Sequence, residues 1–431
     1  MTGPAMKGPA MKGKVLIKGG TVLSLDRAVG NLVEGDVLVE DGVITEVGRS
    51  LHARSAEVVD AADTIVMPGF VDTHRHLWQS LRRSVGTTLG SDDSGAEPGE
   101  YTPDDIYAAT LVGLLHALEA GITTVVDWCD ISGDAAHLEA ALTAHVDSGL
   151  RTVFVPSQQI ATPGSDPRLA FASPDVDGAD ADEIASRWGE ARTAGLRIHA
   201  HAGTAAATGG EVAELGRRNL LGPDVTLSHC TRLSDADLDA IARSSTAVAL
   251  TPASDMARGA GPPPMQQLID RGIRPGLGVG EESLTPRDVF AQMRAVISVQ
   301  HATLFDLKLA GKGGIPNLLG TRDVIRYATI DGARVAGLAD LTGSLTPGKR
   351  ADVIVLRTDR PNIAPVNDPI GAVVWGMDTS NIDWVFVGGE TLVERGELTA
   401  DVVRARALAM AATSQIAPGA SLPAGAGAQP R

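Results

Sequence analysis

The middle of the chain alternates short β-strand patterns with helical segments, and this alternation limits the possible folds more than any other feature. We identify eight strand candidates, and helical signals separate most of them. They are residues 70–76, 122–128, 152–157, 169–173, 197–201, 225–230, 247–252 and 275–280. Eight strand–helix units predict an α/β fold, a closed (β/α)8 barrel of the TIM type. A doubly wound open sheet is the weaker alternative, because no glycine-rich dinucleotide loop follows an early strand.

Capping patterns mark where several helices begin. Thr102 and Pro103, followed by Asp105, have the form of an N-cap, a first-turn proline and an acidic third helical residue. This helix is expected to run to Glu119 and to end before Gly121. The same start pattern recurs at Ser234 with Asp237, and at Thr285 and Pro286 with Asp288.

Segments rich in β-strand patterns flank this region on both sides. The runs KVLIKGGTVLSL, DVLVEDGVITEVG and TIVMPG precede it, and GSLTPGKRADVIVLR, AVVWGM and WVFVGGETLVERG follow it. Asp41-Gly42 is a hairpin-turn signal in the first of these segments. We therefore predict one small β-sandwich domain built from residues 13–66 and 343–400, and a catalytic barrel of residues 67–342. Residues 1–12 are predicted to be a flexible leader, and residues 401–431 a C-terminal helix with a disordered, Ala/Gly/Pro-rich tail.

Charge and cysteine content exclude several classes of function. The chain has 37 basic and 53 acidic residues, a formal net charge of -16, and such a surface repels nucleic-acid backbones. No apolar run approaches the roughly 18 residues of a membrane span. The two cysteines, Cys129 and Cys230, cannot form a disulfide framework and are interpreted as small buried residues. We expect a cytoplasmic protein with no nucleic-acid or membrane partner.

Two histidines close the first strand candidate, in the run GFVDTHRH. A spacing of two places the side chains of His74 and His76 on one face of the strand, at the barrel mouth. Two adjacent imidazoles are natural ligands for zinc, iron or manganese. Arg75 lies between them and is expected to point the other way, into the layer between strand and helix, in a structural role.

Three more histidines lie at predicted strand ends. They are His199 and His201 on the fifth strand, and His229 at the end of the sixth. Five of the ten histidines of the chain therefore face one mouth of the barrel. A single buried histidine is more often structural, but five converging histidines indicate a metal-binding or acid–base site.

Several longer sequence runs have the form of motifs found in metal-binding proteins with a barrel fold. PGFVDTHRHLWQSLRR has the form of a first-strand metal motif, and LSHCTRLSDADLDAIA that of a sixth-strand histidine with its helix. GITTVVDW, VALTPASDMARG and TGSLTPGKRADVIVL fit a second strand, a seventh strand and a returning β-sheet segment. Over nearly the whole chain, these runs resemble the amidohydrolase superfamily, specifically its cytosine-deaminase-like and chlorotriazine-hydrolase-like branch.

The resemblance implies a role for each of these residues. His74, His76 and His201 would bind one divalent metal, with zinc expected and iron or manganese as alternatives. His229 would act in catalysis by contacting the reacting water or the developing oxyanion. The implied substrate-binding residues are Trp78, Gln79 and Trp128, and we also predict that His199 and Asp255 contact the substrate. Enzymes of this kind act on small molecules and are often dimers or larger, so we expect a homo-oligomer.

Two positions depart from the superfamily pattern, and both usually carry carboxylates that transfer protons. Thr204 stands where a glutamate follows the fifth-strand histidine by three residues, and Gly280 stands where an aspartate ends the eighth strand. We expect Glu281 to reach back past the glycine as ligand and base, whereas Glu282 is interpreted as part of a solvated acidic loop. Two further carboxylates lie just beyond strand ends and are reserve candidates for the role of the missing carboxylates: Asp130 and Asp255.

The sequence therefore predicts a hydrolase that acts on a C–N or similar bond of a small cyclic or aromatic substrate, with one divalent metal. The loss of both carboxylates leaves two alternatives open. In the first, Gly280 leaves the site without metal, and the histidines catalyse an elimination, a cyclisation or a rearrangement by acid–base chemistry. In the second, the chain binds a ligand without turning it over.

Overall fold

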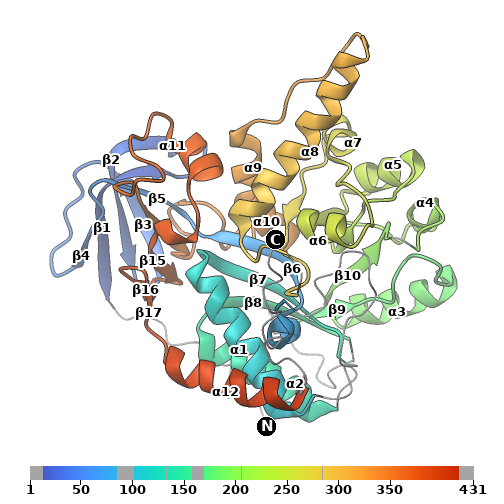
Figure 1. Ribbon diagram of the computed structural model, residues 1–431, viewed down its shortest axis with the longest axis horizontal. Coiled ribbons are helices and arrows are strands. Elements are labelled where there is room, and N and C mark those ends of the chain that lie inside the picture. The colour runs from blue at the N-terminus through green and yellow to red at the C-terminus, as the bar shows by residue number, and fades with distance from the viewer. Residues whose placement is uncertain are drawn as a thin grey trace, which may run out of the picture.

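The computed structural model describes residues 13–84, 101–131, 134–157, 169–204, 206–283 and 285–416. The predicted leader, residues 1–12, and the predicted tail after residue 416 lie outside the described residues. The first and last strands of the chain, blue and red in Figure 1, lie together at one flank of a central barrel. Within the described ranges, no helix has both the length and the apolar character needed to cross a lipid bilayer.

Eight parallel strands form the barrel, and they lie where the sequence predicts them. They are β6 (Phe70–Arg75), β7 (Ile122–Cys129), β8 (Arg151–Pro156), β9 (Ala170–Ala172), β10 (Arg197–Ala202), β11 (Val225–His229), β12 (Ala247–Leu250) and β13 (Gly276–Leu277). Strands β6 to β8 form one hydrogen-bonded sheet, and β9 to β13 form another. A bridge between Phe154 and Leu169 joins β8 to β9, and a bridge between Arg75 and Gly280 joins β6 to the residues after β13. These two bridges close the ring and confirm the predicted barrel.

Helices follow most of the barrel strands along the chain. They are α1 (Pro103–Glu119), α2 (Ala135–Ser148), α3 (Ala181–Thr193), α4 (Glu211–Arg217), α5 (Asp235–Ser244), α6 (Pro252–Ala257), α7 (Met265–Asp270), α8 (Val289–Leu309), α9 (Thr321–Tyr327) and α10 (Ile330–Val335). Complete capping boxes start α1 at Thr102 and α5 at Ser234, as predicted.

The third predicted helix start is wrong by three residues. Helix α8 begins at Val289, and its N-cap is Asp288, whose carboxylate accepts the amide of Ala291 at 2.8 Å. The hydroxyl of Thr285, the predicted cap, has no hydrogen-bond partner among the described residues. The stronger acceptor therefore sets the start of this helix.

Nine strands from the two ends of the chain form a single hydrogen-bonded sheet. They are β1 (Lys14–Leu23), β2 (Asn31–Glu40), β3 (Val43–Gly48), β4 (Glu57–Asp60), β5 (Thr64–Pro68), β14 (Val353–Arg357), β15 (Ile382–Val387), β16 (Glu390–Glu394) and β17 (Glu397–Leu398). Strand β5 joins the two halves, because it pairs with β1 on one side and with β14 on the other. Asp41 and Gly42 both have positive φ angles and form the predicted turn between β2 and β3. The domain boundaries at residues 66/67 and 342/343 stay predictions.

The run AVVWGM does not extend this sheet. Asp368 caps the short helix α11 (Pro369–Gly371) by accepting the amide of Ile370 at 3.1 Å, and a π-helical turn (Ala372–Gly376) follows. Arg294 of α8 donates to the carbonyl of Val374 at 2.9 Å. The β-like composition of this run reflects burial against α8, and Pro369 with its cap decides in favour of a helix.

Helix α12 (Val402–Ile416) lies where the sequence predicts a C-terminal helix. It packs beside α1 (Figure 1) and buries Ala405 and Ala412. This contact fixes the end of the described chain on the barrel.

Backbone hydrogen bonds and one buried carboxylate close the seam between β13 and β6. The amide of Gly280 donates to the carbonyl of His74 at 2.8 Å, and the amide of His76 donates to the carbonyl of Gly280 at 3.1 Å. Asp72 is fully buried and accepts the amide of Val279 at 3.0 Å. Burial raises the pKa of Asp72 to about 6, although the charge of Arg75 opposes the rise. These contacts hold the strand end that carries the first two histidines.

Arg75 and Glu282 complete the seam. The guanidinium of Arg75 is fully buried away from solvent, as expected, and donates to Oε1 of Glu282 at 2.5 Å. Glu282 also pairs with Arg83 at 2.8 Å. Burial alone would raise the pKa of Glu282, but the charges of Arg75 and Arg83 outweigh burial and leave that pKa lowered. The interpretation of Glu282 as a solvated loop residue is therefore wrong, because its charge balances arginines inside the protein.

Glu282→Gln keeps the volume of the side chain and removes the charge that balances Arg75. Breaking a buried ion pair from one side costs about 3–5 kcal/mol, and we expect the free energy of unfolding to fall by that amount. Urea unfolding followed by circular dichroism measures the change. Glu394→Gln at an exposed position of β16 is the control and should change the free energy by less than about 0.5 kcal/mol. A Glu282→Gln protein as stable as the unmodified chain would show that the seam does not need this charge.

Candidate active site

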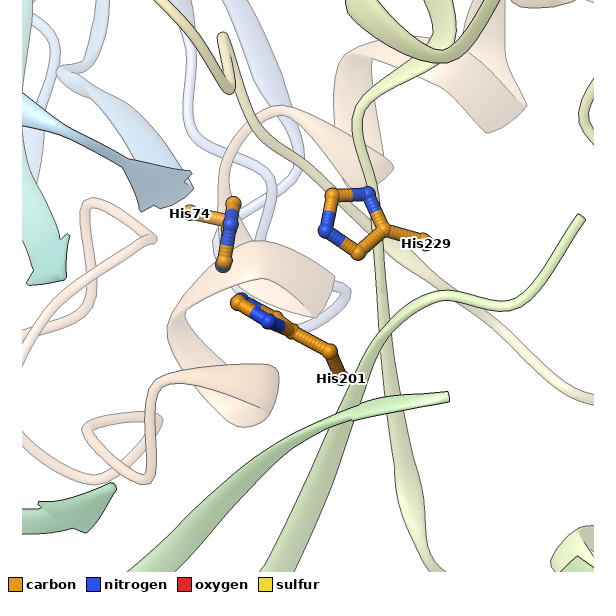
Figure 2. Close-up of side chains that lie close together, drawn as sticks. All are labelled: His74, His201 and His229. Carbon is orange, nitrogen blue, oxygen red and sulfur yellow. The ribbon is translucent and has the colours of Figure 1, made fainter. Parts of the chain in front are cut away.

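Three histidines from different strands meet at the mouth of the barrel. His74 lies on β6, His201 on β10 and His229 at the end of β11, all near the carboxyl ends of their strands. One ligand atom from each ring lies within 4.8 Å of those of the other two, so the group could hold one metal ion. Figure 2 shows the three rings approaching one another from separate elements. The inward direction follows from strand alternation, as expected for each of these positions.

His76 lies beside this group rather than within it. It follows β6 directly, and its Nε2 is 3.2 Å from Nε2 of His74. Two nitrogens that share a tetrahedral zinc at about 2.0–2.1 Å are roughly 3.3 Å apart, so this spacing also suits shared ligation. The ring of His76 is 6.1 Å from that of His201, measured between centroids. The structure thus brings His229 into the group that His76 was expected to complete.

A carboxylate contacts Nδ1 of three of these histidines. The pairs, with their nitrogen-to-oxygen distances, are His76 with Asp130 at 3.1 Å, His201 with Asp175 at 2.9 Å, and His229 with Asp255 at 2.8 Å. A carboxylate at Nδ1 orients the ring and leaves the lone pair on Nε2, an arrangement that supports metal ligation. Nε2 of His201 is buried without a hydrogen-bond partner among the described residues, which fits a nitrogen that binds a metal.

Sequence reasoning missed Asp175. It lies three residues after β9, so it occupies the same kind of position beyond a strand end as Asp130. That position was the available signal for Asp175. The strand before it spans only three residues, so its end is poorly marked in the sequence.

Thr204 occupies the position of the missing glutamate and contacts a carboxylate from another loop. Its amide and its hydroxyl both donate to Oδ2 of Asp177 at 2.7 Å, and the amide of Gly203 donates to Oδ1 at 2.9 Å. The end of β10 therefore has a neighbouring carboxylate, but Asp177 supplies it and uses it to hold the backbone.

Burial keeps most of these imidazoles neutral. It lowers the pKa of His74 well below its usual value, with further lowering from the neighbouring histidines. Burial likewise lowers the pKa of His201 and takes that of His199 to about 3. For His76, burial would also lower the pKa, but the charge and hydrogen bond of Asp130, with the charges of Glu281 and Asp127, together outweigh burial and raise the value. Neutral imidazole is the form that binds metals, so the protonation states suit a metal site.

His199 and Trp128 pack around the histidine group. His199 is fully buried, and neither of its ring nitrogens has a hydrogen-bond partner among the described residues. The indole of Trp128 stacks on His201 with ring centroids 4.1 Å apart and lies 5.3 Å from the ring of His74. Trp128 therefore forms one wall of the site, and direct contact of either residue with a substrate stays a prediction.

Trp78 and Gln79 lie on the short 3-10 helix η1 (Leu77–Arg82), directly after His76. Nε1 of Trp78 donates to Oδ1 of Asp130 at 2.5 Å, the same oxygen that meets His76. Oε1 of Gln79 accepts the amide of Glu282 at 3.4 Å. Trp78 thus positions the carboxylate beside His76, and Gln79 ties η1 to the seam. Their predicted contacts with substrate stay predictions.

Glu281 faces Arg258 at the end of α6 and forms an ion pair with it. Its carboxylate is not part of the ligand group found among the described residues. Its charge contributes, after that of Asp130, to the raised pKa of His76, so Glu281 lies close to the site. Action of Glu281 as ligand or base stays a prediction that requires Arg258 to release it.

Gly280 is built into the local packing at the usual aspartate position. Its φ angle is +77°, and a Cβ placed there would lie 2.8 Å from Cβ of Ser254 and 3.1 Å from Cβ of Thr251. An aspartate at this position would need both a left-handed backbone and the space that Ser254 fills.

Both cysteines are buried and free. Burial raises the pKa of Cys129 and of Cys230 well above the usual thiol value, and nearby carboxylates raise both further. Neutral buried thiols are poor nucleophiles, which agrees with the structural interpretation of these residues.

Comparison with known proteins places these features in a family. The model of the amidohydrolase family matches residues 65–392. The chain is 28% identical to the 5'-deoxyadenosine deaminase of Methanosarcina mazei, over 88% of this chain and 93% of that protein. It is 24% identical to the 5-methylthioadenosine/S-adenosylhomocysteine deaminase of Pyrococcus furiosus, over 89% of this chain and 96% of that protein.

Solved structures share the fold. A zinc-bound adenosine deaminase from Xanthomonas campestris matches with a TM-score of 0.79 and 20% identity, covering 95% of this chain and 100% of that one. A zinc complex of an atrazine chlorohydrolase from Arthrobacter aurescens matches with a TM-score of 0.79 and 22% identity, covering 93% and 100%.

These findings confirm the predicted fold and the predicted class, a hydrolase that acts on C–N bonds other than peptide bonds. The zinc in the solved neighbours and the histidine group together support a divalent metal at this site. The family model covers more than half of the sequence, and the chain belongs to the amidohydrolase family.

Proposed function

We propose that the protein is a metal-dependent deaminase that hydrolyses the exocyclic C–N bond of a small molecule with an adenine-type ring. The observation that carries the proposal is the group of ligand atoms from His74, His201 and His229, all within 4.8 Å of one another. Relatives that match most of the chain are named as deaminases of 5'-deoxyadenosine and of 5-methylthioadenosine or S-adenosylhomocysteine. These names support a nitrogen-rich ring with an amino group as the substrate.

Zinc is the metal that we propose, as in the solved neighbours, with iron or manganese as alternatives. Three imidazole nitrogens are a donor set that catalytic zinc sites use while a further position stays open for chemistry. A bound divalent ion supplies Lewis acidity and activates water for attack on the ring carbon. His76, next to His74, is placed to complete the set or to contact the substrate. Gly280 supplies no ligand, so we expect the metal to be held less tightly than with an additional carboxylate.

The carboxylates around the site keep the histidine rings in place. Asp255 accepts hydrogen bonds from His229 at 2.8 Å and from the hydroxyl of Thr251 at 2.9 Å, so both of its oxygens are engaged. With its Nδ1 bound to Asp255, the His229 ring is fixed with Nε2 free toward the other two histidines. This arrangement supports roles for His229 both in ligation and in orienting the reacting group.

Proton transfer requires a carboxylate close to the histidines, and two residues are candidates. Glu281 is paired with Arg258 and could act only after Arg258 moves. The side chain of Asp130 is 38% exposed, and its partners in the described part of the chain are His76 and Trp78. Burial would raise its pKa, but the charge of His76 and the hydrogen bonds lower it to about 2, so Asp130 is ionised at neutral pH. We propose Asp130 as the first proton carrier and Glu281 as the second.

The absence of carboxylates at Thr204 and Gly280 favours one alternative function. Acid–base groups typically contribute about 10²–10⁴-fold each to catalysis, so their loss without replacement would leave little hydrolysis. The histidines would then catalyse a non-hydrolytic reaction, such as an elimination, a cyclisation or a rearrangement. Isotope labelling distinguishes the two functions, because only hydrolysis transfers oxygen from water to the product.

We also propose that the protein works as a homo-oligomer in the cytoplasm on a small-molecule substrate. Large apolar side chains stay exposed at and after the end of α8, namely Phe305, Leu309 and Leu318. This surface could support contacts between copies of the chain. Binding of a nucleic acid or a membrane is not proposed, because the chain has a formal net charge of -16.

Incubation of the zinc-loaded protein with 5'-deoxyadenosine, 5-methylthioadenosine or adenosine should release ammonia and incorporate one oxygen from labelled water. A strong chelator should reduce the rate at least about 100-fold, and added zinc should restore it. His74→Ala should lose metal and activity together, whereas His52→Ala, at an exposed position, should lose neither. Undiminished turnover in metal-free protein, or product without label from water, would overturn the deaminase proposal.

Asp255→Asn replaces the acceptor at Nδ1 of His229 with an amide of similar size. Removal of such a partner typically lowers metal affinity about 10–100-fold, and we expect that range here. Competition with a fluorescent chelator measures the affinity, and Asp239→Asn on the exposed face of α5 is the control. Unchanged zinc affinity in Asp255→Asn would argue against His229 as a ligand.

Gly280→Asp, combined with Ser254→Gly to remove the side chain that blocks it, tests the missing ligand. Aspartate tolerates a left-handed backbone better than most residues, so the double variant should fold. Zinc affinity should rise at least about tenfold over that of Ser254→Gly alone, because an anionic ligand is added to the three neutral imidazoles. No gain in affinity in a folded double variant would show that residue 280 does not face the metal.

A further inference from the structure

A second pocket lies on the opposite face of the barrel from the histidines. It encloses about 390 Å³ between the loop after β1 and the segment that contains α9 and α10. Arg274, on its rim, lies two residues before β13 begins, and the carbonyl of Ala328, next to Tyr327, accepts the amide of Val71 near the start of β6. The pocket is therefore at the amino ends of the strands, whereas the histidines lie near the carboxyl ends.

Arginines outnumber aspartates in the polar lining of this pocket. Four arginines and three aspartates face it, in a chain whose formal net charge is -16. The arginines are Arg27, Arg274, Arg322 and Arg326, and the aspartates are Asp26, Asp323 and Asp331. An excess of arginine on the surface of an acidic protein needs a specific reason, and recognition of an anion is one.

Each of the three aspartates has at least one partner in the described part of the chain, although Oδ2 of Asp331 has no hydrogen bond there. Asp331 pairs with Arg326 at 3.4 Å, and Asp26 accepts the hydroxyl of Thr346 at 2.6 Å. Asp323 accepts the amide of Gly320 at 3.1 Å, as a cap of α9. Each carboxylate thus has a structural partner.

Three of the arginines have no such partner. Within the described ranges, the guanidinium groups of Arg27, Arg274 and Arg322 make no hydrogen bond and no ion pair within 4.0 Å. Their donors therefore remain available to a ligand, and the planar guanidinium suits phosphate and carboxylate groups.

Tyr327 adds a hydrogen-bond donor at the pocket wall. Its side chain is 5% exposed and lines the pocket, and its hydroxyl has no hydrogen-bond partner in the described part of the chain. Burial raises the pKa of Tyr327 to about 12, with a further rise from Asp323, so the hydroxyl keeps its proton. A protonated phenol beside unpaired guanidinium groups can donate to an anion.

The remaining walls are apolar. Leu23, Leu25, Ile325 and Ile370 line the same space. A volume of about 390 Å³ lies within the range of small-molecule sites, which combine apolar walls with a few convergent polar groups.

We propose that this pocket is a second ligand site, separate from the catalytic one, that binds a small organic anion. The ligand would carry a phosphate or carboxylate group against Arg274, Arg322 and Tyr327, and an apolar portion against Leu25 and Ile325. This inference does not depend on the proposed deaminase activity.

Titration calorimetry at low ionic strength tests the site with three probes that share a ring. Phenyl phosphate and benzoate carry the two candidate anionic groups, and benzyl alcohol carries none. At least one anion should bind with a stoichiometry of one, and benzyl alcohol should bind at least about tenfold more weakly. The two anions separate a phosphate site from a carboxylate site.

Variants locate the binding. Arg274→Ala combined with Arg322→Ala should raise the dissociation constant at least about tenfold, and both positions are exposed, so the fold should persist. Tyr327→Phe keeps the ring and should weaken binding about fivefold. Arg395→Ala, at an exposed position in the sheet domain, and His74→Ala, in the histidine group, should leave the affinity unchanged.

Three results would overturn the proposal. They are no binding of either anion, equal binding by the arginine double variant and the unmodified chain, and loss of binding in His74→Ala. None of these results uses enzyme activity as its readout, so failure of this site is distinguishable from failure of the deaminase proposal.

Discussion

The pairing of β13 with β6 around buried Arg75 is the interaction on which the rest of the molecule depends. A TIM barrel exists only if its last strand returns to its first, and here that return brings together residues more than 200 positions apart, such as Arg75 and Glu282. Asp72 and Glu282 balance the arginine from both sides of the seam. The backbone bonds between Gly280 and the residues around it hold His74 at the height of the other strand-end histidines. A change at the seam would therefore reach the candidate metal site directly.

The candidate site is acidic around a neutral centre. Burial keeps His74 and His201 unprotonated, while Asp130, Asp175 and Asp255 contact the outer nitrogens of their neighbours. Negative charge around neutral imidazoles attracts a divalent cation and stabilises it once bound. The opposite face of the barrel differs, because three arginines around the second pocket have no ion-pair partner among the described residues. The two faces thus differ in the sign of the small ion or group that they can bind.

The sequence predicted the features that depend on local pattern. Alternation placed His74, His201 and His229 on inward faces, and the capping residues Thr102 and Ser234 located two helix starts. These predictions succeeded because the residues that determine strand alternation and helix capping lie within a few positions of one another in the sequence. The run AVVWGM was wrongly predicted to be a strand, because composition alone does not distinguish a buried helical turn from a buried strand.

The features that the sequence does not reveal depend on distant contacts. Glu282 looks like a loop residue until Arg75 and Arg83 are placed beside it. Nothing near Asp175 in the sequence indicates that His201 will meet it, and Glu281 gave no sign of its pairing with Arg258. Whether His76 or His229 completes the ligand group likewise depends on how far each strand end reaches into the mouth.

Anomalous diffraction at the zinc edge, from crystals of the full chain grown with zinc, tests the central claim most directly. The account predicts one strong peak within about 2.0–2.3 Å of a ring nitrogen of each of His74, His201 and His229. Two results would contradict the account. In one, zinc is fully occupied at another place in the crystal but absent from the barrel mouth. In the other, the zinc peak contacts none of these three histidines.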